Sequence, residues 1–161
     1  MQIQIREMNE EDVPSVVEII RRTMLREDVE LAKRTLTHYF RSREELTPGY
    51  FPKKFYVAVE DGEVIGVSGS YVYDERAWLG WFAVKPEYQG NGIGKALLKK
   101  AESDVKDEYE RFFVYTGSSK EFAKAREFYK RNGFVEEQLE KYKFDEDTLI
   151  FSKELRLDLK I

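Results

Sequence analysis

Hydrophobic residues recur along the chain with two periods, and each change of period separates a predicted strand from a predicted helix. Apolar and polar residues alternate from Ile3 to Glu7, which predicts a short strand. Asn9 can then cap a helix, with Asp12 as its capping-box partner. Apolar residues at i, i+3 and i+4 predict this helix from Val13 to Met24, and a second helix follows over Val29 to Phe40.

The middle of the chain is predicted to form an antiparallel meander. Pro48, Gly49 and Pro52 indicate a loop from Ser42 to Lys54. Three strands follow it, at Phe55 to Val59, Val64 to Tyr73 and Trp78 to Val84, joined by tight turns at Asp61-Gly62 and Asp74-Glu75. Lys85-Pro86 ends the third strand, because proline cannot donate a ladder hydrogen bond.

The second half of the chain alternates helices and strands. A glycine-rich turn from Gly90 to Gly94 opens a helix with an apolar face of Ile93, Leu97, Ala101 and Val105. The remaining elements are a strand at Phe112 to Thr116, a helix from Glu121 to Asn132 that Gly133 ends, and two strands at Phe134 to Phe144 and Thr148 to Leu155. This order predicts an α/β protein with one domain over residues 1–161, in which a mixed, mostly antiparallel sheet carries helices on both faces.

The amino-acid composition excludes several classes of function. The 161 residues include no cysteine and one histidine, His38, so thiolate chemistry and multi-histidine metal sites are excluded, and we expect no metal. The net charge of −4 gives no general electrostatic reason to bind nucleic acid. No apolar run reaches the roughly 18–20 residues that span a bilayer, and the N-terminus lacks an apolar signal core. We therefore expect a cytoplasmic protein that binds neither nucleic acid nor membranes.

The glycine-rich turn carries the most specific chemical signal. Gly90, Gly92 and Gly94 alternate where a strand becomes a helix, and glycine lets a ligand approach the backbone closely. The first helical turn has unpaired N–H groups and a dipole that favours an anion, so the segment can cradle a phosphate or diphosphate. A purely structural helix cap is the alternative. The segment is not a P-loop, since no Gly-Lys-Ser/Thr ends it, and it matches the dinucleotide fingerprint poorly.

Segments around this turn resemble motifs of the GNAT superfamily of N-acetyltransferases. Gln89-x-x-Gly92-x-Gly94 resembles its acyl-CoA signature, and Ala125-x-x-Phe128-Tyr129-x-x-x-Gly133-Phe134 resembles its second motif. The flanking Phe82 to Tyr88 and Gly94 to Leu98 match the family's preceding strand and following helix. The resemblance covers nearly the whole chain. It implies the acyl-CoA N-acyltransferase fold, with acetyl-CoA as co-substrate and a primary amine as acceptor.

The resemblance also implies a set of site residues. Backbone groups of the third strand would bind the pantetheine arm, and those of the turn would bind the diphosphate, which implicates Phe82, Ala83, Val84, Gln89, Gly90, Asn91, Gly92, Ile93, Gly94 and Lys95. Tyr129 would contact the coenzyme and act as general acid, because a phenol can protonate the departing thiolate; packing in the helix is the alternative. Phe122 replaces an asparagine common in relatives, so Ser118 or Ser119 would have to supply that contact.

A general base is harder to find. Many relatives carry a glutamate on the third strand, but Trp78 to Phe82 contains no carboxylate. The candidates are the turn residues Asp74 and Glu75, a water relay through tyrosines, and the histidine, which has a suitable pKa. The tyrosines are Tyr71, Tyr73 and Tyr115, and the histidine is His38. Each of these residues also has an ordinary surface or packing role, and orientation alone can supply much of the rate.

The acceptor site is expected from the family at Met24 to Lys54 and Glu136 to Asp147. An acidic group there could attract a cationic amine, although a solvated strand edge that discourages strand pairing is the more ordinary explanation. The group consists of Glu136, Glu137, Glu140, Asp145, Glu146 and Asp147. The strand from Thr148 resembles members that acetylate protein N-termini. The resemblance leaves room for a homodimer. The alternatives to an enzyme are a non-catalytic acyl-CoA sensor and an unrelated phosphate-binding α/β protein.

Overall fold

The computed structural model describes residues 2–42, 44–138 and 147–155. Its elements in chain order are β1 (Gln4–Glu7), η1 (Glu10–Asp12), α1 (Val13–Thr23), α2 (Arg26–Arg41), β2 (Tyr50–Glu60), β3 (Glu63–Tyr73), β4 (Arg76–Leu79), β5 (Ala83–Val84), η2 (Pro86–Tyr88), α3 (Ile93–Ser103), β6 (Arg111–Gly117), η3 (Lys120–Phe122), α4 (Ala123–Arg131), β7 (Val135–Glu137) and β8 (Thr148–Glu154). Among these described helices, none is long and apolar enough to cross a membrane.

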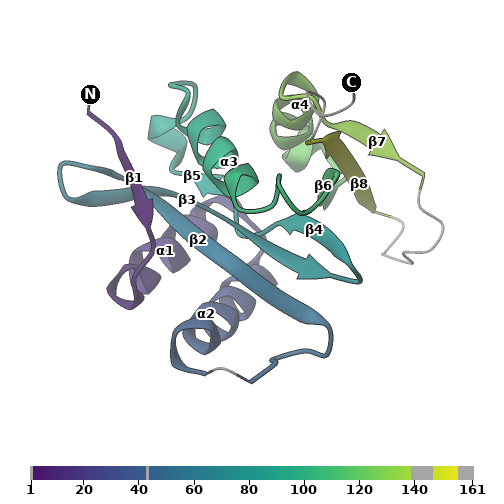
Figure 1. Cartoon of the computed structure of the whole chain (residues 1–161). Helices are drawn as coiled ribbons and strands as arrows, with labels where there is room; N and C mark the ends of the chain where they lie inside the picture. The colour runs from purple at the N-terminus through teal and green to yellow at the C-terminus, as the bar shows by residue number, and fades with distance from the viewer. Residues whose placement is uncertain (1, 43, 139–146, 156–161) are drawn as a thin grey trace.

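The strands form one sheet in the order β1-β2-β3-β4-β6-β8-β7, and β5 pairs with β3 beside this path. Every pair is antiparallel except β4 with β6. Helices α1 and α2 lie on one face of the sheet, and α3 and α4 lie on the other (Figure 1). The predicted fold class, a mixed and mostly antiparallel sheet with helices on both faces, is therefore confirmed.

Apolar side chains fill a core on each face. On one face α1 and α2 pack against Val57 and Val67, and their fully buried residues include Ile20 and Leu36. On the other face Leu97 of α3 packs against Ile65. A further cluster joins α3 and α4 to β4, β6 and β8. Burial on this scale is the main favourable term in folding, and it fixes the backbone on both sides of the sheet.

Three sequence predictions of element boundaries were wrong in part. Residues 50–54 are not loop, because β2 begins at Tyr50. Pro52 is tolerated there because this part of β2 pairs with β3 but lies outside the β1–β2 register, and a register shift follows it. The late helix begins with η3 and becomes α-helical only at Ala123. Of the predicted strand from Phe134 to Phe144, β7 forms Val135–Glu137, and residues 139–146 lie outside the described ranges.

A fourth correction matters most for function: the predicted strand from Trp78 to Val84 is interrupted. Leu79 pairs with Ser70 and Ala83 pairs with Val67, so the β4–β5 side contains one extra residue, as in a β-bulge. The N–H of Gly80 still donates to the carbonyl of Gly69 at 2.7 Å. Two apolar strands separated by such a break look like one strand in the sequence, because hydropathy does not report a change of register.

Candidate active site

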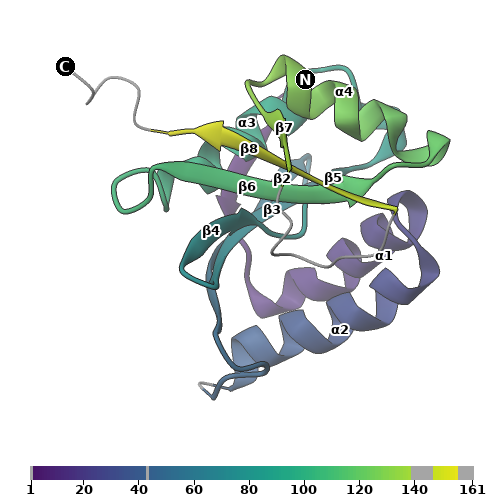
Figure 2. The same cartoon turned by 90° about the vertical axis from the view of Figure 1, so that its right-hand side faces the viewer.

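The break between β4 and β5 opens the sheet. β6 pairs with β4 only at Ala77–Phe112 and Trp78–Phe113. In the described chain β5 pairs only with β3, so its other edge has no strand partner, and we call this gap in strand pairing between β5 and β6 the opening of the sheet. Figure 2 shows β6 and β8 side by side with α4 above them. The backbone edge of β5 is therefore available to an extended ligand, much as a further strand would use it.

The glycine turn lies directly after β5. Gly90 and Gly92 have positive φ values of 85° and 78°, and α3 begins at Ile93. The first recorded backbone bond into the helix runs from the Ala96 N–H to the Gly92 carbonyl at 3.1 Å. Within the described residues, the N–H groups of residues 91–95 have no acceptor. They are the unpaired amides of a helix start, where an anion is favoured.

Side chains hold this turn in place. The Gln89 amide donates to the Val84 carbonyl at 2.9 Å, and the Asn91 amide donates to the Tyr88 carbonyl at 3.2 Å. On α1, Arg22 makes a bidentate ion pair with Glu87 of η2 at 2.7 and 3.0 Å. This pairing lowers the pKa of Glu87 to about 2. The turn is thus tied to both β5 and α1 without any side chain entering its amide cradle.

The three glycines of the turn serve different purposes. A Cβ added at Gly90 or Gly92 would meet no atom within 4 Å, so the space beside these residues is open and only the positive φ requires glycine. A Cβ at Gly94 would lie 3.3 Å from the Phe128 ring. Gly94 is therefore needed at least for the packing of α3 on α4, in addition to any approach of phosphate.

Residues 82–84 combine core packing with a backbone edge that no described strand pairs, although the Val84 carbonyl accepts the Gln89 side-chain amide. Ala83 and Val84 are buried, on the α1 face and the α3 face respectively. The Phe82 ring packs on Phe128 at 5.3 Å and on Tyr129 at 6.2 Å between ring centroids. These contacts are compatible with a pantetheine-binding role, because that role would use the main chain.

Tyr129 projects from α4 into an aromatic pocket next to the opening. Tyr129 is 6% exposed, and the centroid of its ring lies 5.5 Å from that of Phe134 and 6.4 Å from that of Phe151. Burial raises the pKa of Tyr129, and the neighbouring Tyr115 raises it further. The phenol therefore keeps its proton at neutral pH and can donate it to a ligand.

The α2 face of the opening is also aromatic. Trp78 and Phe113 are buried there with Ile150, and Tyr71 packs on them. The ring centroid of Tyr115 lies 6.3 Å from that of Trp78, and Tyr115 is 48% exposed. Burial raises the pKa of Tyr71 and that of Tyr115. Neither phenol is ionised at neutral pH, so these residues could relay a proton but could not start as a base.

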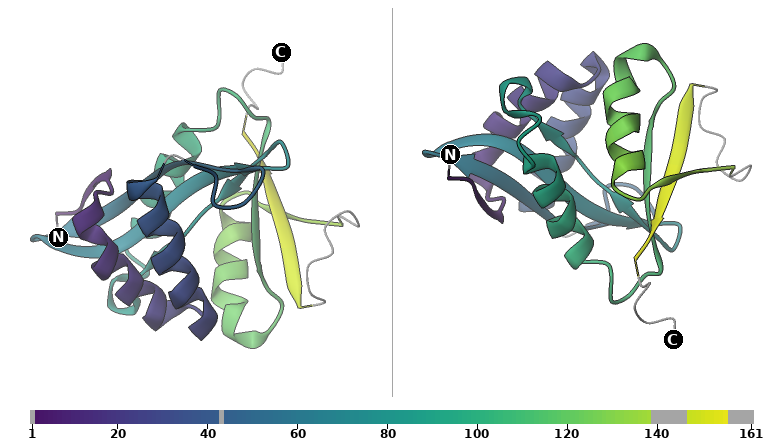
Figure 3. Two further views of the ribbon diagram at one scale, coloured as in Figure 1. Left: turned by 90° about the horizontal axis from the view of Figure 1, so that it is seen from below. Right: turned by 90° about the horizontal axis from the view of Figure 1, so that it is seen from above.

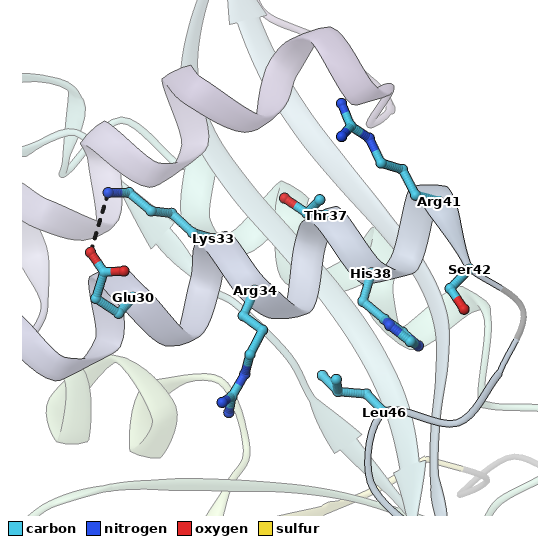
Figure 4. A pocket seen from close by; sticks show the side chains of 8 residues that line it. All are labelled: Glu30, Lys33, Arg34, Thr37, His38, Arg41, Ser42 and Leu46. Carbon is cyan, nitrogen blue, oxygen red and sulfur yellow. Dashed lines mark hydrogen bonds and ion pairs between the residues drawn. The ribbon is translucent and has the colours of Figure 1, made fainter.

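The other base candidates lie elsewhere. Asp74 and Glu75 form the β3–β4 turn with positive φ, at the opposite end of β4 from the break. His38 lies in a shallow groove on the outer face of α2 (Figure 4), where its Nε2 is 2.5 Å from the Glu44 carbonyl. Tyr129 and Tyr115 do not line that groove. The structure therefore does not bring these three candidates to the opening.

Sequence reasoning missed Asp28, at the start of α2. One carboxylate oxygen accepts the Leu25 N–H at 3.0 Å, which is an ordinary capping contact and gave no reason to suspect a site. Desolvation raises the pKa of Asp28, and its negative charge raises the pKa of Tyr115. Only the fold could reveal that α2 begins near β6.

Few of the acidic and polar side chains that the sequence proposed for the acceptor and coenzyme sites are free to bind a ligand among the described residues. Glu137 pairs with Arg111 and Ser152, whereas Glu136 is exposed on β7, and Glu140, Asp145 and Glu146 lie outside the described ranges. Phe122 packs over Gly117, where a Cβ would come within 2.3 Å of its ring. The Ser119 hydroxyl donates to Glu121. Among the described residues, no cluster of three or more histidines or acids could hold a metal ion.

Comparisons with known proteins agree with this geometry. Residues 52–136 match the model of the acetyltransferase (GNAT) domain. An uncharacterised N-acetyltransferase of Methanocaldococcus jannaschii is 32% identical over 109 residues, which are 64% of this chain and 67% of the relative. The matched domain includes β5, the glycine turn and Tyr129, so the segments that build the opening are the segments that carry the family pattern.

Two crystal structures, each 25% identical, extend the likeness to 96% of this chain and 99% of the other. A GNAT-family protein of Desulfovibrio desulfuricans has a TM-score of 0.80. The PaiA N-acetyltransferase of Thermoplasma acidophilum, solved in complex with coenzyme A, has a TM-score of 0.72. Sequence pattern, interrupted sheet and glycine turn therefore lead to one conclusion: this chain belongs to the GNAT acetyltransferase family.

Proposed function

We propose that this chain is an acetyl-CoA-dependent N-acetyltransferase that acetylates a primary amine of a small molecule, peptide or protein. The observation that carries the proposal is the placement of Tyr129, a buried phenol whose ring contacts Phe82, the residue directly before β5. The family assignment supports acyl transfer, and the coenzyme A complex of the PaiA relative supports the choice of carrier.

The glycine turn, the edge of β5 and Tyr129 would each have a different role in the reaction. Acetyl-CoA supplies an acetyl thioester, and transfer replaces its C–S bond with a C–N bond to the amine. Main-chain N–H groups between Gln89 and Lys95 would hold the diphosphate, and the free edge of β5 would hold the pantetheine arm. Tyr129 keeps its proton at neutral pH, because its pKa is raised, and would donate a hydrogen bond to the leaving sulfur. The proton that the amine loses would reach this sulfur through the phenol or water, so that the products are an amide and a free thiol.

The test compares the wild type with Tyr129→Phe. Thiol release from acetyl-CoA is measured against a panel of amines, and acetyl-CoA affinity is measured by calorimetry. We expect the variant to lose roughly 100-fold in kcat, the lower range for general acid catalysis, with little change in affinity. Tyr109→Phe is the matched control, since Tyr109 packs against the same core cluster away from the opening.

One outcome would overturn the proposed activity, and another would overturn only the role of Tyr129. Tight acetyl-CoA binding without transfer to any amine would indicate a non-catalytic acyl-CoA sensor. Full activity of Tyr129→Phe would show that the Tyr129 hydroxyl takes no part in the reaction, while the proposed acetyltransferase activity would stand.

A further inference from the structure

The segment that leads into the amide cradle of residues 89–95 contains one acidic residue, Glu87. It is the only aspartate or glutamate between Arg76 and Ala101 in the sequence. Glu87 belongs to η2, the short helix that connects β5 to the glycine turn. A free carboxylate at this position would repel the negative charges of a diphosphate held by the turn. Any group that balances the charge of Glu87 would therefore favour coenzyme binding.

Arg22 of α1 balances this charge with a defined geometry. Its two terminal nitrogens donate to the two carboxylate oxygens of Glu87 at 2.7 and 3.0 Å, although the residues are 65 positions apart in the chain. Such a bidentate pair fixes the relative orientation of its two planar groups as well as their separation. The pairing also lowers the pKa of Glu87, so the carboxylate stays ionised at neutral pH. Both side chains remain partly exposed, so we expect the pair to contribute little to overall stability.

The two partners of this ion pair differ in how firmly the fold holds them. Arg22 lies in the last turn of α1, where Ile19 and Ile20 are fully buried in the core. Glu87 lies on an exposed segment, and in both views of Figure 3 the teal chain that leads into α3 lies beside the purple helix α1. Among the described residues, the Arg22–Glu87 pair is the only hydrogen bond or ion pair between α1 and residues 86–92. It therefore ties the glycine turn to a well-packed helix.

Building on the proposed function, we propose that Arg22 is a positioning residue for acetyl-CoA that acts through Glu87. The ion pair holds η2, and with it the first residues of the glycine turn, beside α1, so that the main-chain N–H groups are in place before the diphosphate binds. The pair also neutralises the one carboxylate of the segment that would oppose the charge of the ligand. Because Glu87 precedes the turn and Tyr129 lies on α4, the pair affects coenzyme binding and not the transfer step.

Variants of the pair separate this role from that of an ordinary surface contact. Arg22→Gln removes the cation and leaves Glu87 charged, Glu87→Gln removes the pair together with the negative charge, and the double variant completes a cycle. Arg22→Lys keeps the charge and loses the bidentate fork. Lys53→Gln is the control, since Lys53 pairs with Glu108 at 3.2 Å between β2 and the segment after α3, away from the glycine turn. Calorimetry gives the acetyl-CoA Kd, and steady-state kinetics against a panel of amines gives KM and kcat.

We expect Arg22→Gln to raise the Kd and the KM of acetyl-CoA about fivefold or more, the scale of one exposed ion pair combined with an unbalanced charge. Its kcat and the KM of the amine should stay near wild type. Glu87→Gln should have a smaller effect, because it removes the repulsive charge together with the tie, and the double variant should match Glu87→Gln. Arg22→Lys should restore part of the affinity, and Lys53→Gln should bind acetyl-CoA as the wild type does.

Three results would overturn the inference while the proposed function stands. If the wild type binds acetyl-CoA and Arg22→Gln binds it equally well, the pair is an ordinary surface contact. If the melting temperature of Arg22→Gln falls and its Kd does not change, the pair is purely structural. If the effects of the two single variants multiply in the double variant, Arg22 acts on the ligand without Glu87. A wild type that binds no acetyl-CoA would instead overturn the proposed function, and the inference with it.

Discussion

At the scale of single residues, Tyr129 links the chemistry of the site to the stability of the fold. Its pKa is raised in the folded protein, because burial disfavours the phenolate. Above about pH 10 the unfolded chain therefore loses this proton before the folded chain does, and stability falls as pH rises. We expect the melting temperature of the wild type to drop more steeply between pH 8 and 11 than that of Tyr129→Phe. Parallel curves for the two proteins would contradict the burial argument.

At Gly92 the backbone conformation, rather than a lack of space, disfavours any residue with a side chain. Its φ is +78° and the space around a Cβ is open, so Gly92→Ala should destabilise the fold by about 1–2 kcal/mol through backbone strain alone. Gly62 provides a matched control, with φ of +80°, open space and a place in the β2–β3 turn. We expect both alanine variants to lower the melting temperature and only Gly92→Ala to weaken acetyl-CoA binding in calorimetry.

At the scale of elements, α2 and the break in the sheet are coupled through one side-chain hydrogen bond. Thr35→Val removes the acceptor of the Trp81 indole and keeps the shape of the side chain. Loss of this partly buried bond should cost about 1 kcal/mol of stability. It should also raise the KM for acetyl-CoA, since the backbone after Trp81 leads into β5. A variant with lower stability but an unchanged KM would show that the bond supports α2 and not the site.

The order and type of the elements were largely predictable, because period-2 and period-3.6 patterns are local properties of the sequence. Gly133 ended the late helix as expected, and the Asp61-Gly62 turn lies between β2 and β3. The break after Leu79 was not predictable, because one extra residue between paired strands depends on the partner strand. Pro52 shows the same limit, since its place in β2 depends on which strand lies next to it.

At the scale of the whole molecule, the candidate site combines residues that belong to sequence motifs with residues that only the fold brings together. The glycine turn and Tyr129 belong to motifs, so the sequence could identify them. The effect of Asp28 on the pKa of Tyr115 could not be identified this way, because the two residues are about 90 positions apart along the chain. The fold joins the start of α2, the end of β6 and the middle of α4 around one opening.

A ligand that fits this opening should stabilise the whole fold. Binding to the native state alone adds about 2.7 kcal/mol at a concentration 100 times the Kd. We expect acetyl-CoA to raise the melting temperature of the wild type, and we expect a smaller shift for Gly92→Ala at the same concentration. Equal shifts for the two proteins would contradict the role of the turn in binding.

The central claim is that the edge of β5 and the turn after it hold acetyl-CoA. Amide hydrogen exchange with and without the ligand tests this most directly, because it reports both binding and location. The account predicts slower exchange in peptides that cover residues 82–95 on addition of acetyl-CoA, and no change in β1 or in the His38 groove of α2. Unchanged exchange over residues 82–95, or protection confined to another surface, would contradict it.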